Sequence, residues 1–248
     1  MAKLKNDSIC SKTKSRAQDR SIGKVGYRPI RSYLAMALGE TVLLIVLLTY
    51  LSRTFIALSL IGLWAAHLLS MWRKLRFEVT FLYTVKTGGH DWWTPVTQEI
   101  ILGAIPLDHH LLHLRENRVT HLITLLEPFE QRPGLVTPLS ETRLLQHGIK
   151  RTTIPTQDFS PVEATHIANC VGLLHDQSKA GNKTYVHCKA GRGRSATIVV
   201  AYLLRHGIDG QIFSSAREAY AYLKKIRPQI NLNDGQIAAL EEYKRLYF

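Results

Sequence analysis

Cysteine and acidic residues are scarce in this sequence. Its 248 residues include three cysteines, Cys10, Cys170 and Cys188, whose spacing forms neither a disulfide framework nor, with the histidines, a metal-ligand pattern. We therefore expect a reducing compartment and no metal or other cofactor. Nineteen Asp and Glu stand against 32 Lys and Arg, a net charge of +13 that favours anionic partners. Internal repeats and low-complexity tracts are also missing, which argues against a repeat architecture.

Residues 1–32 contain too few apolar side chains to form a core. Nine basic residues and two aspartates give this segment a net charge of +7. We expect a disordered basic arm. Its charge favours contact with an anionic membrane face over the alternative of a merely solvated tail.

An almost continuous apolar stretch follows over residues 33–72, too long for one straight bilayer span. Ser52-Arg53-Thr54 divides it into 33–51 and 54–72, two pieces of 19 residues that can each cross a bilayer. We expect a transmembrane helical hairpin with both termini and the following domain on the cytoplasmic side. The alternatives are a signal peptide, which lacks a small-residue cleavage site here, and a single span followed by a membrane-surface helix.

Residues 73–97 are expected to connect this region to a domain over 98–248. Trp92 and Trp93 favour packing in the core of that domain over a position at lipid headgroups. Expected strands alternate with expected helices after residue 98. The strands are 98–103, 119–126, 149–154 and 184–187, and the helices are 107–117, 138–147, 160–177, 195–205, 214–226 and 233–246. This alternation predicts an α/β domain with a central, mostly parallel sheet.

Residues 186–195 read Val-His-Cys-Lys-Ala-Gly-Arg-Gly-Arg-Ser and lie between an expected strand and a buried helix. A glycine-containing loop at a helix N-terminus points backbone N–H groups at one spot, where the helix dipole favours negative charge. The same field lowers the pKa of a thiol, so we expect Cys188 to be largely thiolate near neutral pH. Arg194 adds a planar fork that fits two phosphate oxygens. A nucleophilic sulfur in such a loop predicts a phosphatase site.

His187-Cys188, five residues and then Arg194-Ser195 match the signature of the protein tyrosine phosphatase superfamily. The alternative, a structural cysteine in a basic loop, is disfavoured by the number of matching positions and by the strand and helix on either side. The resemblance is to the dual-specificity branch. It implies the cysteine-phosphatase fold and hydrolysis of a phosphomonoester through a phosphocysteine on Cys188. The phosphate-binding residues that it implies are Lys189, Ala190, Gly191, Arg192 and Gly193.

This chemistry also needs a proton donor for the leaving alkoxide. Residues 156–161 resemble the movable aspartate loop of dual-specificity phosphatases, which makes Asp158 the general acid and then the base that activates water. The alternative is that Asp158 caps the next helix, although Ser160 already suits that task. Four other carboxylates lack this context: Asp108, Glu127, Glu130 and Asp176. Glu127 is the least unsuitable substitute among them.

The remaining site residues have supporting roles in the resemblance. Ser195 is expected to donate to the Cys188 sulfur, and His187 to orient the loop rather than act as a base. Asn233 and Gln236 either brace the active loop or cap the last helix. Cys170 is expected in the core, with a protective disulfide to Cys188 as the alternative.

Lys189 and Arg192 suit a substrate with negative groups beyond its phosphate. Their loop resembles those of lipid-directed members, the phosphoinositide phosphatases and the mitochondrial-type phosphatidylglycerophosphate phosphatases. Similarity to the latter covers roughly residues 92–246 and departs around Asp158. We therefore expect a membrane-anchored phosphatase that acts on a phospholipid headgroup. The alternatives are a dual-specificity protein phosphatase for phosphotyrosine and phosphoserine/threonine, and an inactive anionic-lipid-binding module. Nucleic acid is disfavoured because the basic residues gather beside the apolar stretch and no aromatic-rich binding face is evident.

Overall fold

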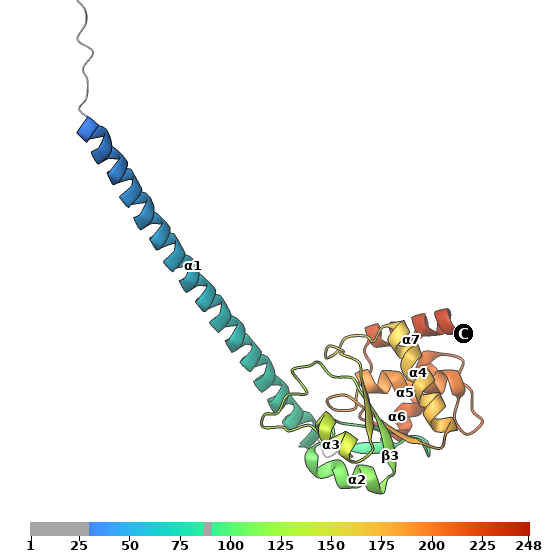
Figure 1. The fold of residues 1–248 in the computed structure, drawn as a ribbon. Helices are drawn as coiled ribbons and strands as arrows, with labels where there is room; N and C mark the ends of the chain where they lie inside the picture. The colour runs from blue at the N-terminus through green and yellow to red at the C-terminus, as the bar shows by residue number, and fades with distance from the viewer. Residues whose placement is uncertain (1–29, 87–90) are drawn as a thin grey trace, which may run out of the picture. The chain divides into compact units, whose positions relative to one another are not determined.

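The computed structural model describes residues 30–86 and 91–248. The basic arm expected over 1–32 lies almost wholly outside the described residues. The chain divides into two units at Leu63 and Trp64, and the second unit contains the α/β domain (Figure 1).

Helix α1 (Ile30–Phe81) runs without interruption through the point where a break was expected, and continues into a π-helical turn, η1 (Leu82–Lys86). The hydroxyls of Ser52 and Thr54 donate to carbonyls of the preceding turn at 2.9 Å, so both side chains are accommodated inside the helix. Neither glycine nor proline stands there to interrupt it. The predicted hairpin of helices 33–51 and 54–72 is therefore wrong, and one continuous helix takes its place.

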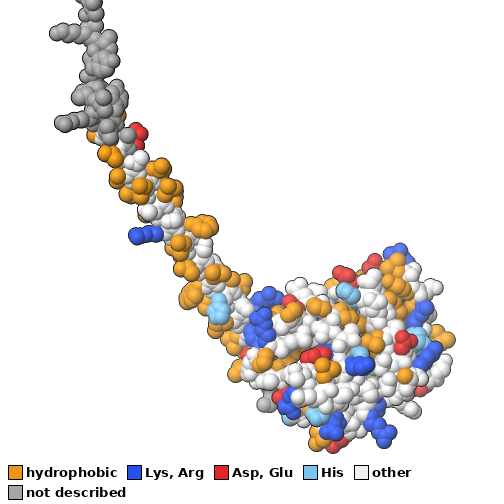
Figure 2. Space-filling view, in the orientation of Figure 1, with side chains coloured by type: hydrophobic (Ala, Val, Ile, Leu, Met, Phe, Trp, Pro, Cys, Tyr) orange, Lys and Arg blue, Asp and Glu red, His pale blue; other side chains and the backbone are white. Residues whose placement is uncertain are grey.

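Large apolar side chains are exposed along most of α1, from Met36 to Leu75, and they dominate the face of the helix that Figure 2 shows. Its side chains are exposed there, and mean hydropathy reaches 2.0 within Leu38–Val85. An apolar helix without packing partners requires either a lipid environment or another protein surface. By length and composition, α1 is the one candidate membrane span among the described residues.

A five-stranded sheet forms the centre of the domain. Its order is β1-β2-β5-β3-β4, with β1 antiparallel to β2 and every other pair parallel. The strands are β1 (Trp93–Pro95), β2 (Ile100–Gly103), β3 (Val119–Thr124), β4 (Lys150–Thr153) and β5 (Lys183–His187). The mostly parallel sheet is confirmed. The edge strand β1 was missed because three residues ending in proline carry no strand periodicity.

Six helices and one 3₁₀ turn complete the described part of the domain, and most of the helices begin later than expected. They are η2 (Asp108–His110), α2 (Leu111–Glu116), α3 (Glu141–Gln146), α4 (Ala164–Lys179), α5 (Arg194–His206), α6 (Ala216–Ile226) and α7 (Asp234–Tyr247). Helix α3 starts after Ser140, whose hydroxyl accepts from Arg143 N at 3.3 Å, rather than at Pro138. Helix α4 starts after Glu163, so Ser160 does not cap it.

Two hydrophobic clusters cover the two faces of the sheet. Helices α4, α5, α6 and α7 pack over one face, where α5 is buried almost throughout. Helices α2 and α3 pack with Tyr185 and Trp93 on the other face. A third cluster joins Phe77 and Phe81 of α1 to residues that follow β2 and β3, with Trp92 beside them. Both tryptophans thus pack in the domain, as predicted. The end of α1 is part of the domain, near the edge where the parallel strands finish.

Candidate active site

The loop 188–193 joins the carboxyl end of the central strand β5 to the N-terminus of α5. Its backbone turns through Gly191, whose φ is +66°. A Cβ there would come within 2.5 Å of the Gly103 carbonyl, so only glycine fits. The loop therefore sits tightly against β2, at the helix N-terminus where an anion is most favoured.

Cys188 is buried at the start of this loop, and Ser195 Oγ donates to its Sγ at 3.2 Å. Burial by itself would raise the pKa of the Cys188 thiol. The charge of Arg194 and the hydrogen bonds from Ser195 and from the backbone of Arg192 oppose this, and the pKa falls below its ordinary value. The surroundings of Cys188 thus favour the nucleophilic thiolate.

Arg194 is fully buried and its guanidinium faces three oxygen-bearing groups. It forms a bidentate pair with Glu130, Nη1 to Oε2 at 2.7 Å and Nη2 to Oε1 at 3.1 Å, and Nη1 also donates to the Thr156 carbonyl at 2.8 Å. Burial opposes the charge, but Glu130 raises the pKa of Arg194 above its ordinary value. The buried Nε has no hydrogen-bond partner among the described residues. A buried N–H without a partner is rare, and here a phosphate oxygen would satisfy it.

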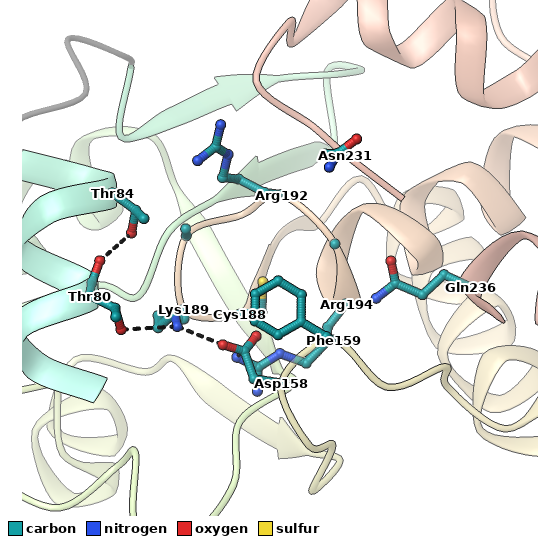
Figure 3. Close-up of a pocket in the computed structure, with 12 residues that line it drawn as sticks. Thr80, Thr84, Asp158, Phe159, Cys188, Lys189, Arg192, Arg194, Asn231 and Gln236 are labelled. Atoms are coloured by element: carbon teal, nitrogen blue, oxygen red, sulfur yellow. Dashed lines mark hydrogen bonds and ion pairs between the residues drawn. The ribbon is translucent and has the colours of Figure 1, made fainter. Parts of the chain in front are cut away.

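Asp158 lies beside two cationic side chains, those of Arg194 and Lys189 (Figure 3). Its Oδ1 is 3.0 Å from Arg194 Nη2, and its Oδ2 accepts from Lys189 Nζ at 2.6 Å. The alternative of Asp158 as a helix cap finds no support, because α4 begins only after Glu163. The carboxyl group faces the phosphate-binding loop instead.

Asn233 and Gln236 hold the Asp158 loop from the start of α7. Both form a capping box there, and Asn233 Nδ2 also donates to the Phe159 carbonyl at 2.7 Å, while Gln236 Nε2 donates to the Ser160 carbonyl at 3.3 Å. Phe159 has a φ of +64°, a conformation that a side chain of its size adopts only under constraint. Each residue thus caps α7, and the hydrogen bonds to Phe159 and Ser160 brace the Asp158 loop rather than the Cys188 loop.

His187 is buried beneath the loop. Its Nε2 lies 2.8 Å from Thr124 Oγ1 and its Nδ1 lies 3.3 Å from the Cys188 carbonyl. Burial, reinforced by the charges of Arg151 and Arg194, lowers the pKa of His187 to about 3. The neutral ring links β3 to the loop, which supports an orienting role rather than that of a base.

A pocket of about 320 Å³ opens above Cys188. It brings together most of the predicted site residues, whereas Ser195, His187, Gly191 and Asn233 lie outside its lining. Arg192 reaches its edge with Nε donating to the Gln229 carbonyl at 2.9 Å. The lining residues are Thr80, Thr84, Asp158, Phe159, Cys188, Lys189, Ala190, Arg192, Gly193, Arg194, Asn231 and Gln236.

Residues 110–246, more than half of the chain, match the family model described as dual specificity phosphatase, catalytic domain. The chain belongs to the dual specificity phosphatase family. It is therefore a cysteine-based phosphatase.

Curated relatives of this phosphatase include three with related names. Phosphatidylglycerophosphate phosphatase PTPMT1 of Arabidopsis thaliana is 38% identical over 174 residues, covering 67% of this chain and 48% of that protein, so the match spans about half of the relative's length. PTPMT2 of the same plant is 32% identical, covering 70% of this chain and 73% of that protein. Phosphatidylglycerophosphatase and protein-tyrosine phosphatase 1 of Homo sapiens is 31% identical, covering 69% of this chain and 86% of that protein.

Among solved structures, the crystal structure of PTPMT1 in complex with PI(5)P resembles this phosphatase with a TM-score of 0.56 and 27% identity. The similarity covers 63% of this chain and 96% of that chain. This similarity supports the predicted resemblance to the phosphatidylglycerophosphate phosphatase type.

Two residues that support the site were not assigned to it from the sequence. Glu130 had been set aside for lack of motif context, yet it holds Arg194, while Glu127, the least unsuitable substitute for Asp158, pairs with Arg73 of α1 at 3.0 Å. Arg227 is buried and its Nε donates to the Gly191 carbonyl at 3.1 Å. Its only sequence signal was its place in a segment that resembles the family. In this phosphatase Glu130 fixes Arg194 and Arg227 braces the loop, each from a distant part of the chain.

We expect Cys188 to react with iodoacetamide at a lower pH than an ordinary thiol. The thiolate fraction rises as pH passes the pKa, and this pKa is lowered, so the rate constant should reach half its maximum below about pH 8.5. Ser195→Ala removes the hydrogen bond to sulfur and should move that midpoint up by about one pH unit. Cys170, a free thiol in the core whose pKa burial raises to about 12, is the internal control in the same mass spectrum. A Cys188 midpoint at or above that of free cysteine would contradict the assignment of the nucleophile.

Proposed function

We propose that this phosphatase removes a phosphomonoester from a phospholipid headgroup through a phosphocysteine on Cys188. One observation carries the proposal: Cys188 and Arg194, whose Nε has no hydrogen-bond partner among the described residues, line a pocket that is also lined by the basic residues Lys189 and Arg192. To bind and attack a single phosphate, the site needs only Cys188 and Arg194. The two further charges suit a substrate with additional negative groups, such as the phosphodiester of a phospholipid.

In the first step, the Cys188 thiolate attacks phosphorus and the bond from phosphorus to the headgroup oxygen breaks. The backbone N–H groups of 189–194 and the guanidinium of Arg194 stabilise the non-bridging oxygens. An arriving phosphate would replace Asp158 on Arg194 Nη2, which frees the carboxyl group to give its proton to the leaving oxygen.

In the second step, water attacks the phosphocysteine while the Asp158 carboxylate takes the proton of that water. The bond between sulfur and phosphorus breaks and inorganic phosphate leaves. Ser195 Oγ, 3.2 Å from the sulfur, stabilises the departing thiolate by donating a hydrogen bond to it.

The names of the relatives support a lipid substrate, since PTPMT1 and PTPMT2 of Arabidopsis thaliana are phosphatidylglycerophosphate phosphatases and a PTPMT1 structure contains PI(5)P. The apolar surface of α1 supports membrane attachment. Attachment would confine the domain to the bilayer surface and raise the effective concentration of a headgroup. If α1 crosses once, the chain before it and the chain after it lie on opposite sides, so the expectation of both termini on one side is not retained. We keep the catalytic domain on the cytoplasmic side, where Cys188 stays reduced.

The division of the chain remains a proposal: a basic arm, the apolar helix, a connector and a catalytic domain over 98–248. We add the end of α1 to the catalytic domain, because Phe77 and Phe81 are buried in one of its hydrophobic clusters.

A second candidate function is a protein phosphatase for phosphotyrosine and phosphoserine/threonine. The human relative carries both activities in its name. An inactive lipid-binding module is disfavoured, because a binder would not need Cys188, Asp158 and Arg194 together.

Phosphate release by the full chain separates these functions. The substrates are phosphatidylglycerophosphate and a set of phosphoinositides in mixed micelles, and a phosphotyrosine peptide in the same detergent. We expect one of the lipids to exceed the peptide by at least about a hundredfold in kcat/KM, which corresponds to about 2.7 kcal/mol of transition-state discrimination. A preference for the peptide would replace the lipid proposal with the protein phosphatase. No release from any substrate, with lipid binding retained, would favour the inactive module.

A further inference from the structure

The end of α1 forms one wall of the active-site pocket. Thr80 and Thr84 line it together with the Cys188 loop (Figure 3). They are four residues apart and therefore lie on the same face of the helix. Neither belongs to the segment 110–246 that matches the family model. A wall from outside the common catalytic domain is a place where substrate choice can differ between family members.

This wall is held firmly in place. Phe77 and Phe81 are 4% and 1% exposed, and their rings pack against Phe129 and Trp92 at centroid distances of 6.3 and 5.7 Å. Lys74 Nζ donates to a carbonyl of the loop that carries Glu130. The helix ends in the π-helical turn Leu82–Lys86, which contains Thr84. Such turns are frequent at functional sites, and this one interrupts the regular helix where it meets the pocket.

The hydrogen-bond capacity of the two hydroxyls determines what they can bind. Thr80 Oγ1 donates to the Arg76 carbonyl at 2.8 Å and accepts from Lys189 Nζ at 3.3 Å. Thr84 Oγ1 donates to the Thr80 carbonyl at 2.7 Å. A hydroxyl has one hydrogen and two lone pairs, so the Thr84 hydroxyl, whose hydrogen is used within the helix, keeps the capacity to accept a hydrogen bond, and Thr84 lines the pocket. Its complement on a substrate is a hydrogen-bond donor near the phosphate.

We propose that Thr84 is a specificity-determining residue that accepts a hydrogen bond from a polyol hydroxyl beside the phosphate that is removed. Thr80 supports it by holding Lys189 on the same side of the pocket. The glycerol of phosphatidylglycerophosphate and the ring of a phosphoinositide carry such hydroxyls, whereas the side chain of phosphotyrosine has none next to its phosphate. This inference rests on the proposed lipid function and names the chemical group of the headgroup that the site recognises.

The test compares two lipids with the same acyl chains, using the full chain in mixed micelles. Phosphatidylglycerophosphate has a free headgroup hydroxyl, and phosphatidic acid is a phosphomonoester without one. The quantity measured is the ratio of their kcat/KM values. Thr84→Val keeps the shape but removes the acceptor, and should lower this ratio about tenfold, the effect of one neutral hydrogen bond. Thr84→Ser should restore it.

Thr49→Val is the matched control, because the Thr49 hydroxyl likewise donates to a carbonyl of its own helix, that of Val46 at 2.9 Å, and Thr49 does not line the pocket. It should leave the ratio unchanged. A ratio that Thr84→Val does not alter would overturn the inference while the lipid function stands. If the wild-type chain hydrolyses an aryl phosphate but neither these lipids nor phosphoinositides, the proposed function fails first and the inference with it.

Discussion

Cys188→Ser is expected to lower kcat by at least about four orders of magnitude on every substrate, because a serine hydroxyl in the same place remains protonated and is a poor nucleophile. The surroundings that lower the pKa of the Cys188 thiol have no comparable effect on an alcohol, whose ordinary pKa is far higher. The backbone N–H groups of the loop and the guanidinium of Arg194 remain. Substrate binding should therefore persist while turnover is lost.

The measurement is phosphate release from phosphatidylglycerophosphate and from p-nitrophenyl phosphate, together with cosedimentation on vesicles that contain the lipid substrate. Cys170→Ser is the matched control: its thiol is buried on α4 away from the pocket, so its kinetics should be those of the wild type. Release by Cys188→Ser within tenfold of the wild-type rate would remove Cys188 from the role of nucleophile.

Asp158→Asn is expected to reduce kcat/KM about a thousandfold on a phospholipid but about tenfold or less on p-nitrophenyl phosphate. A glycerol or inositol alkoxide is a poor leaving group and requires the proton of a general acid, whereas nitrophenolate leaves without one. The ratio kcat/KM reports the first irreversible step, so the later role of Asp158 as a base does not obscure the comparison.

Phosphate release by both variants on both substrates checks this dependence on the leaving group. Asp176→Asn is the control, since Asp176 lies on α4 outside the pocket lining. Equal losses on the two substrates would show that Asp158 acts only by holding Lys189 and Arg194 in place. In that case the acid would have to be sought elsewhere.

The local part of the site could be predicted from the sequence because it lies within ten consecutive residues. The order strand, loop, helix around Cys188 follows from residue type and periodicity, and so does the mostly parallel sheet. Positions inside the loop fix the relation of Cys188, Arg194 and Ser195 without reference to any distant segment. The spacing of the loop after Thr156 likewise indicated Asp158.

The long-range part could not be predicted in this way. Glu130 is 64 residues before Arg194, and no periodicity links the two, yet their bidentate pair is buried. Thr80 and Thr84 looked like ordinary residues of a connector. They reach the pocket only because α1 continues as a helix past residue 73 and packs against the domain.

The helix itself shows the limit of reasoning from length. The polar residues Ser52, Arg53 and Thr54 suggested a turn, since a mainly apolar stretch of 40 residues exceeds one bilayer crossing. Each of the two hydroxyls, however, bonds to its own helix, and no residue there forces the backbone to turn. A polar interruption is a weaker signal than glycine or proline.

The central claim, a phosphatase for phospholipid headgroups, is tested most directly by competition in one reaction. The full chain in mixed micelles receives phosphatidylglycerophosphate, a phosphoinositide and a phosphotyrosine peptide together, each with a distinguishable product. The ratio of initial rates at equal concentrations then equals the ratio of kcat/KM. The account predicts at least about a hundredfold preference for one of the lipids. Equal rates, or a faster reaction with the peptide, would contradict it.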